Sequence, residues 1–219
     1  NFTPECLVKA WVSCKVSELG AFPEAQLNAQ QFARKFSTAV RIAKADPYRA
    51  TTHNKGIFNG IDAVVLATGN DFRAIEACGH AFAARNGRYE SLSECAVEGD
   101  TFTFSITVPL AVGTVGGLTK LHPLAKRSLE ILGNPGAKEL MMIIASVGLA
   151  QNFSAVRALV TSGIQKGHMK MHLTNILRHF GASDIEIQSA TTYFADKTVS
   201  FSNVREYLQN YRANLAPEK

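Results

Sequence analysis

The chain has 219 residues, of which 46% are hydrophobic and 19% charged, with a formal net charge of +5. These proportions are those of a folded globular protein and exclude a disordered or fibrous chain. The length allows one large domain or a domain and a half. The basic residues are scattered, without a run of five. This pattern argues against nucleic-acid binding and fits an anionic small-molecule partner better.

The cysteines Cys6, Cys14, Cys78 and Cys95 form no C-x-x-C pair and lie near no histidine cluster, so we expect no metal site. They do not indicate a disulfide scaffold, so we expect reduced thiols and a cytoplasmic protein. We see no signal peptide and no apolar run of the roughly 18 residues that a membrane span needs, and we expect no membrane partner. Because the chain starts at Asn1 rather than Met, we expect its natural start to lie upstream.

The first predicted element is a half-buried strand at residues 7–16, where apolar side chains alternate with polar ones. The stretch that follows looks helical, so the partners of this strand are expected to be distant or missing. Residues 28–45 have apolar side chains at helical spacing and predict a helix that Asp46 and Pro47 end. Residues 47–54 are expected to form an irregular connector.

The most unusual stretch is residues 51–77, in which the polar turns NKG and GND flank the apolar run 57–67. Only Asn59 and Asp62 interrupt this run, so we expect it to be buried nearly all round, unlike an ordinary amphipathic helix. A buried element with a lysine at one end and an aspartate at the other is costly unless the charges have partners. This cost is the first indication of a site.

Beyond this stretch the sequence predicts a hairpin and a series of helices, and the fold class is α+β. We expect a mainly helical large domain around the buried central helix, with a β-hairpin, and a small helical C-terminal flap. The predicted elements are a helix from Asn70 or Asp71 to Gly87, strands 91–97 and 101–108, helices 123–132, 137–150 and 152–162, a hinge at 163–167, and helices 168–180 and 203–215, the last capped by Asn203 and Glu206.

Three polar residues of the central stretch each allow two interpretations. Lys55 is either a solvated lysine at a helix start or, because the helix dipole disfavours a cation there, one that meets an acidic partner or an anionic ligand. Asp71 is either a plain N-cap or a cap that also pairs with Lys55. Asn59 shares a face with Lys55 if the helix has begun, and is otherwise a satisfied core amide.

The histidines of HMKMH, His168 and His172, lie one helical turn apart. They lack the glutamate of HExxH and a third ligand, which argues against zinc. His168 is either a surface residue or a general acid on a movable flap, since its charge changes near neutral pH. The glycine-rich GTVGG does not match GxGxxG and is better explained by a backbone bend.

Four motifs together carry a family resemblance: DPYRATTHNKGIFNGIDAVVLATGND, GTVGGLTKLHP, VGLAQN and IQKGHMKMHLTNI. In this order, over about residues 40–180, they resemble the class II, soluble bacterial 3-hydroxy-3-methylglutaryl-CoA (HMG-CoA) reductases. That family interconverts HMG-CoA with mevalonate and CoA, using two equivalents of NADH or NADPH. The residues present do not decide between the two cofactors or the physiological direction, and cofactor-binding residues stay unassigned. The resemblance also implies a homodimer or a larger homo-oligomer with the active site near the subunit interface.

The resemblance implies a role for each matched residue. Lys55 in NKG matches the catalytic lysine, whose ammonium stabilises the oxyanion formed at the thioester carbonyl. Asp71 in GND matches the aspartate that holds that lysine, and His168 in GHM matches the histidine that protonates the departing CoA thiolate. Arg49 matches an arginine that clamps the terminal carboxylate of the substrate. The further residues matched to the substrate site are Asn59, Gln151 and Asn152.

The family's catalytic glutamate and its DAMGAN-type dinucleotide stretch lie upstream of the matched region and do not occur here. We therefore expect residues 1–20 to hold a residual strand of a truncated cofactor domain, cut from its sheet. Residues 21–163 would form the large catalytic domain and residues 164–219 the flap with the catalytic histidine. The chain is interpreted as the C-terminal half of the enzyme, inactive alone. The alternatives are a non-catalytic remnant that keeps the dimer scaffold and an acyl-CoA-binding module.

Overall fold

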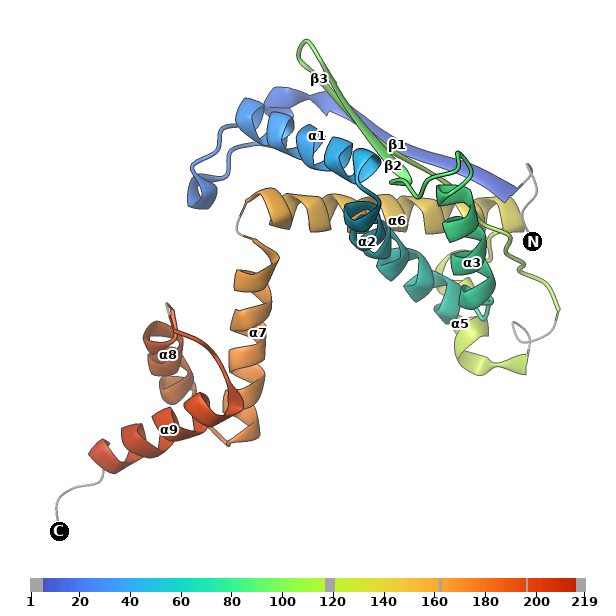
Figure 1. Cartoon of the computed structure of the whole chain (residues 1–219). Coiled ribbons are helices and arrows are strands. Elements are labelled where there is room, and N and C mark those ends of the chain that lie inside the picture. Colours follow the sequence, from blue (N-terminus) through green and yellow to red (C-terminus); the bar gives the residue numbers. More distant parts are fainter. Residues whose placement is uncertain (1–5, 117–120, 162, 196, 216–219) are drawn as a thin grey trace. The chain divides into compact units, whose positions relative to one another are not determined.

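A computed structural model describes residues 6–116, 121–161, 163–195 and 197–215. The chain divides into two compact units, Asn1–Thr161 and Ser162–Lys219 (Figure 1). The first contains one sheet and most of the helices, and the second is helical, which confirms the predicted α+β class. The elements are β1 (Leu7–Lys15), α1 (Ala29–Ala45), α2 (Pro47–Ala67), α3 (Phe72–Ala83), β2 (Ser93–Glu98), β3 (Thr101–Pro109), α5 (Pro123–Ile131), α6 (Ala137–Val160), α7 (Ile164–His179), α8 (Asp184–Tyr193) and α9 (Phe201–Leu215).

The sheet is antiparallel with strand order β1-β3-β2, so the predicted hairpin forms its centre and one edge. Along β3 the side chains that alternate inward are fully buried, and Ala10 of β1 lies opposite Ile106. Strand β1 pairs with β3 from end to end. The expectation that this strand is cut from its sheet is therefore wrong. Its partner is β3, which is distant in the sequence, and the register runs from Leu7 opposite Pro109 to Lys15 opposite Thr101.

Helix α1 packs against the inner face of the sheet and carries an aromatic cluster. Asn28 caps it by accepting a hydrogen bond from the Gln31 backbone amide at 2.9 Å, and the helix occupies the range that the apolar spacing predicts. The ring of Phe36 lies 5.0 Å from that of Phe104 and 5.1 Å from that of Phe153 on α6. These contacts join the sheet, α1 and α6 into one core.

Helix α2 starts at Pro47, so the irregular connector expected at 47–54 is wrong. Asp46 accepts a hydrogen bond from the Tyr48 amide at 3.0 Å, and proline is favoured in the first helical turn. The expectation of burial all round is also wrong, because Asn59 is exposed and Leu66 is 57% exposed. The low charge of this run thus marks an apolar helix with one open face.

Helix α6 is a single helix, so the break expected between residues 150 and 152 is wrong. Those positions contain neither glycine nor proline, and nothing there interrupts the backbone ladder. Among the described residues, α6 is the one helix with the length and apolar composition of a membrane span. In this chain it packs against α2, β1 and β3 as a core helix (Figure 1).

The second unit has its own core, formed where α7, α8 and α9 meet. Gly163, at φ +79°, precedes α7, so the irregular segment is shorter than the predicted 163–167. Helix α8 was not predicted, although Ser183 and Glu186 form a capping box before it. Helix α9 begins two residues earlier than expected, and the Asn203 amide donates to the Ser200 hydroxyl instead of forming a pair with Glu206.

Candidate active site

The site is built where α2 crosses α6, and glycines set the distance between the two helices. A Cβ atom on Gly60 would lie 2.8 Å from Gln151 Cβ and 2.9 Å from the Val147 carbonyl oxygen. A Cβ atom on Gly148 would lie 2.9 Å from Ile61 Cγ1. Only hydrogen fits at these positions, so the backbones approach closely. We call this contact the glycine seam.

Polar side chains line the open edge of the glycine seam. Lys55 and Asn59 lie one turn apart on α2 and both are exposed. Gln151 is exposed on α6, and its Cβ abuts α2 at Gly60. The fold therefore brings an ammonium and two side-chain amides to adjoining helices.

Asn152, the neighbour of Gln151, points inward instead. It is 1% exposed, and its Nδ2 donates to the His53 carbonyl oxygen at 3.3 Å. Its Oδ1 is buried and has no hydrogen-bond partner among the described residues. Asn152 thus contacts the α2 backbone at His53, two residues before the exposed lysine.

His53 is a residue of the site that sequence reasoning missed. It is 3% exposed, and its Nε2 lies 2.6 Å from the Ser93 hydroxyl on β2. Burial, and then the nearby charge of Arg49, lower the pKa of His53 from 6.5 to about 4. The imidazole is therefore neutral at physiological pH. No sequence signal marked this histidine, because it fell in a stretch expected to be irregular.

The two residues before Lys55 fix how α2 is turned about its axis. The buried amide of Asn54 donates to the Glu90 carbonyl at 2.9 Å and accepts from the Leu92 amide at 3.0 Å. With His53 bound to β2, both positions face inward. Since successive helical residues are about 100° apart, Lys55 then emerges towards solvent.

Asp71 caps α3, as predicted. It accepts hydrogen bonds from the amides of Arg73 at 3.0 Å and Ala74 at 3.4 Å. Its carboxylate also forms an ion pair with the Arg73 guanidinium at 3.2 Å, and its side chain is 52% exposed. The hydrogen bond from the Arg73 side chain lowers the pKa of Asp71, which favours the ionised form.

One chain does not bring Lys55 and Asp71 together. The helix from Lys55 to the end of α2 spans about 18 Å at 1.5 Å per residue. Helix α3 then folds back, because Gly79 packs against the ring of Phe58. Asp71 therefore lies at the far end of α2, and no ion pair joins the two among the described residues.

An acidic pair lies between α2 and α3. Burial, and then the charge and hydrogen bond of Glu76, raise the pKa of Asp62 to about 6. Asp62 Oδ1 is buried and has no hydrogen-bond partner in the described part of the chain. Two carboxyl groups so placed favour a shared proton.

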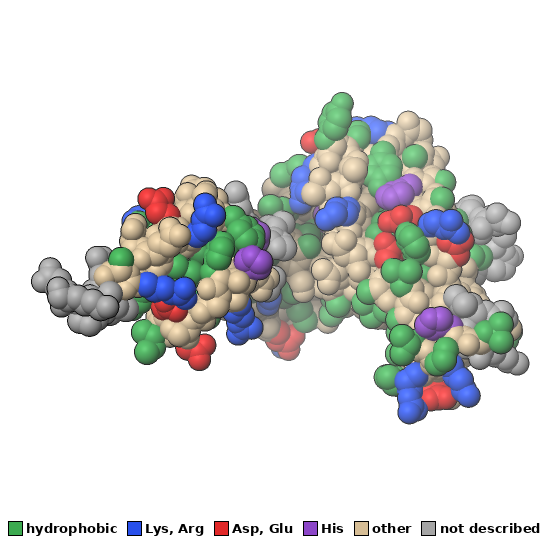
Figure 2. All heavy atoms as spheres, turned by 90° about the horizontal axis from the view of Figure 1, so that it is seen from below, with side chains coloured by type: hydrophobic (Ala, Val, Ile, Leu, Met, Phe, Trp, Pro, Cys, Tyr) green, Lys and Arg blue, Asp and Glu red, His purple; other side chains and the backbone are tan. Residues whose placement is uncertain are grey.

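The side chain of His168 lies outside the described residues, and its backbone belongs to α7 of the second unit. Residues 117–120, which belong to the GTVGGLTKLHP motif, are likewise outside them. Within the described ranges, no group of three His, Cys, Asp or Glu side chains is placed to hold a metal ion. The basic side chains on the face drawn in Figure 2 are interleaved with acidic and neutral ones.

Comparison with known proteins identifies the family. The family model for hydroxymethylglutaryl-coenzyme A reductase matches residues 1–173, so the chain belongs to this family, as predicted. It is 43% identical over 194 residues to 3-hydroxy-3-methylglutaryl-coenzyme A reductase of Archaeoglobus fulgidus, covering 88% of this chain and 44% of that protein. A probable reductase of Borreliella burgdorferi is 41% identical over 158 residues, or 70% of this chain and 37% of its own length.

Comparison with solved structures finds the same family. The class II reductase of Streptococcus pneumoniae, bound to NADPH in open conformations, is 44% identical, with a TM-score of 0.67 over 94% of this chain and 50% of its own. A second structure of the enzyme from that organism, at 43% identity, gives the same TM-score and covers 49% of its chain. The chain therefore spans about half the length of these relatives, or less.

Proposed function

We propose that this chain forms the thioester-activating part of an HMG-CoA reductase. The observation that supports this most directly is the open edge of the glycine seam, where Lys55, Asn59 and Gln151 gather on the two helices that carry the family's motifs. Arg49, in the first turn of the same helix, adds a second positive charge. Two cations and two amides suit a substrate with a carboxylate and a developing oxyanion.

The active site is proposed to need two copies of the chain. Lys55 lies near the middle of α2 and Asp71 lies beyond its C-terminal end, yet the Lys55 ammonium is exposed, and the ionised Asp71 carboxylate, which pairs with Arg73, is half exposed and open to a second cation. A twofold interface over the open face of α2 would place Asp71 of one copy beside Lys55 of the other, since such interfaces are self-complementary. The exposed Leu66 on that face supports this contact.

The free thiols of Cys14, Cys78 and Cys95 fit a reducing compartment such as the cytoplasm.

In the proposed chemistry, some residues stabilise or bind negative charge and one donates a proton. Lys55 stabilises the negative charge that develops on the thioester carbonyl oxygen, and Asp71 holds the ammonium in position. Arg49 binds the substrate carboxylate, and His168 protonates the leaving thiolate. Asn152 acts through the α2 backbone and not by touching substrate. The nicotinamide supplies hydride when bound, and we assign no residue of this chain to that ring.

Binding of HMG-CoA to the 219-residue chain tests the proposal, because it does not require turnover. Calorimetric titration should show affinity that Arg49→Ala and Lys55→Ala each weaken about tenfold or more, since charge-assisted contacts are lost. Lys35→Ala, which removes an exposed lysine from α1, is the matched control and should leave the affinity unchanged. Equal affinity in all three variants, or no binding at all, would favour a non-catalytic scaffold.

A further inference from the structure

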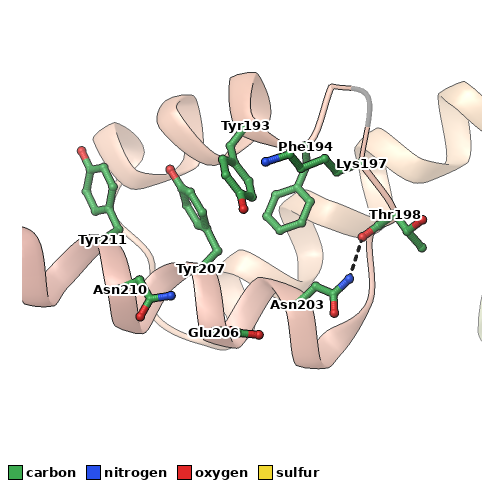
Figure 3. Close-up of a pocket in the computed structure, with 9 residues that line it drawn as sticks. All are labelled: Tyr193, Phe194, Lys197, Thr198, Asn203, Glu206, Tyr207, Asn210 and Tyr211. Carbon is green, nitrogen blue, oxygen red and sulfur yellow. Dashed lines mark hydrogen bonds between the residues drawn. The ribbon is translucent and has the colours of Figure 1, made fainter.

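A cluster of buried polar side chains in the first unit must find its hydrogen-bond partners within the protein. In the cavity of the second unit, polar side chains such as those of Glu206 and Asn210 are exposed, so water can satisfy them (Figure 3). The side chains of His53, Ser93 and Asn152 are instead almost fully buried. The distribution of protons among these three side chains is therefore set by the protein alone.

The cluster joins three elements of the first unit, because His53 belongs to α2, Ser93 to β2 and Asn152 to α6. The His53 Nε2 atom lies 2.6 Å from the Ser93 hydroxyl oxygen. The Asn152 Nδ2 atom donates to the His53 carbonyl oxygen at 3.3 Å. One histidine thus contacts both the sheet and the helix that packs against α2.

The contact between His53 and Ser93 indicates which ring nitrogen carries the proton. Its 2.6 Å length is nearer to the about 2.7–2.8 Å of a hydroxyl donor than to the about 2.9–3.0 Å of an N–H donor. The Ser91 hydroxyl uses its own proton on the Ser93 carbonyl oxygen at 3.1 Å. The Ser93 hydroxyl is then free to donate to Nε2, which favours a neutral ring with its proton on Nδ1.

The Asn152 amide offers the acceptor that this tautomer needs. Its bond to the His53 carbonyl oxygen places the amide nitrogen there, so the amide cannot be reversed. Its Oδ1 atom is buried and meets no donor in the described part of the chain. Burial and the charge of Arg49 lower the pKa of His53, and a polar contact from the Asn152 side chain opposes them, as an acceptor facing the ring would. An Nδ1–H group directed at Oδ1 satisfies both atoms.

We propose that His53, as the Nδ1–H tautomer, is a positioning residue that holds Lys55 and Gln151 in register across the glycine seam. The inference rests on the proposed function, in which those two side chains belong to one site. One edge of the ring is bound to β2 through Ser93, and the other is bound to α6 through Asn152. The seam glycines set how closely the helices approach, and the imidazole sets their rotation.

The positions of the two site residues in the sequence explain the effect. Lys55 follows His53 by two residues on α2, and Gln151 directly precedes Asn152 on α6. Because side chains project radially from a helix, rotation of either helix about its axis separates the ammonium from the amide. His53 touches neither substrate nor reacting atoms in this role and acts only through its neighbours.

The tautomer is tested without any substrate. Two-bond nitrogen–proton NMR correlations of the 219-residue chain at neutral pH should show that Nδ1 of His53 is protonated and Nε2 is not. Ser93→Ala should shift the Nε2 resonance, because that atom loses its donor. An Nε2–H tautomer, or a mixture of the two forms, would overturn the proposal. This result is independent of whether the chain binds HMG-CoA, so it is distinct from failure of the proposed function.

A double-mutant cycle separates positioning from stability. In calorimetric titrations Ser93→Ala should weaken HMG-CoA binding about fivefold, the size of one neutral hydrogen bond. In the Lys55→Ala background the same change should cost nothing further, since no ammonium is left to position. Equal losses in both backgrounds would mean a merely structural role and would contradict the proposal.

Two comparisons complete the experiment. His53→Gln, whose side-chain amide reaches the position of Nε2 and can still meet Ser93, should retain more affinity for HMG-CoA than His53→Ala. Ile75→Val, a truncation of a buried core residue on α3, is the control for lost stability and should leave the affinity unchanged. Affinity that falls as much in Ile75→Val as in Ser93→Ala would show that stability alone is responsible.

Discussion

Substitution by alanine should have opposite effects on stability at two glycines of α2, Gly56 and Gly60, because only Gly60 lies in the glycine seam. Replacing Gly60 by alanine places a methyl group 2.8 Å from Gln151 Cβ and 2.9 Å from a backbone oxygen, neither of which can move freely. Replacing Gly56 places it 3.5 Å from Ala155 Cβ and 3.8 Å from Asn152 Nδ2, which are ordinary contacts. The two positions are one turn apart on the same helix, so each is the control for the other.

The magnitudes follow from two opposing effects. Alanine stabilises a helix interior by about 1 kcal/mol relative to glycine. Overpacking of a close contact costs about 1–3 kcal/mol. Gly56→Ala should therefore raise the free energy of unfolding by about 1 kcal/mol. Gly60→Ala should lower it by up to about 2 kcal/mol, because there the contact outweighs the propensity.

Urea denaturation followed by far-ultraviolet circular dichroism measures both variants. In thermal melts, 1 kcal/mol corresponds to about 2–4 °C for a chain of this size. The variants should thus lie on opposite sides of the wild type. A Gly60→Ala protein as stable as Gly56→Ala would refute the close approach of α2 and α6 on which the site depends.

Three further predictions concern charge. The pKa of His53 falls from 6.5 to about 4 on folding, so between these pH values the unfolded chain binds a proton that the folded chain does not. The free energy of unfolding should therefore decline by up to about 3 kcal/mol as the pH falls from 6.5 to 4. Urea denaturation at a series of pH values should show this decline, and His53→Asn should reduce it. The pKa of Asp62 is raised from 3.8 to about 6, so stability should fall as pH rises through that interval, and Asp62→Asn should stabilise the chain at pH 8 but not at pH 4. Arg212 lowers the pKa of Glu186 to about 2; in Arg212→Ala, an NMR titration of Glu186 should show that pKa rising towards 4.5, and no change would contradict the pairing.

Local patterns in the sequence were enough to predict the elements with clear signals. Alternation identified β1 and the hairpin, helical spacing of apolar residues identified α1, and a short polar side chain at Asn70 or Asp71 marked the start of α3. The pairing of β1 with β3 could not be predicted, because it depends on a contact between strands far apart in the chain. Periodicity alone was enough to predict the α+β class but not the order of the strands in the sheet.

The candidate site divides in the same way. The motif resemblance selected Lys55, Asn59 and Gln151, which the fold gathers at the glycine seam. It did not reveal that Asn152 is buried or that His53 joins α2 to β2, since both facts depend on how the helix is turned. The close approach at Gly60 has a sequence trace in the spacing G-x-x-x-G, which acquires meaning only once α6 lies against it.

The central claim is that Lys55 of one copy meets Asp71 of another. A mixture of nitrogen-14 and nitrogen-15 chains treated with a zero-length carbodiimide, which joins an amine to a contacting carboxylate, tests it directly by mass spectrometry. The account predicts a cross-linked Lys55–Asp71 peptide that includes mixed-isotope pairs. A link found only within chains of one isotope, or no link between these two residues, would contradict it.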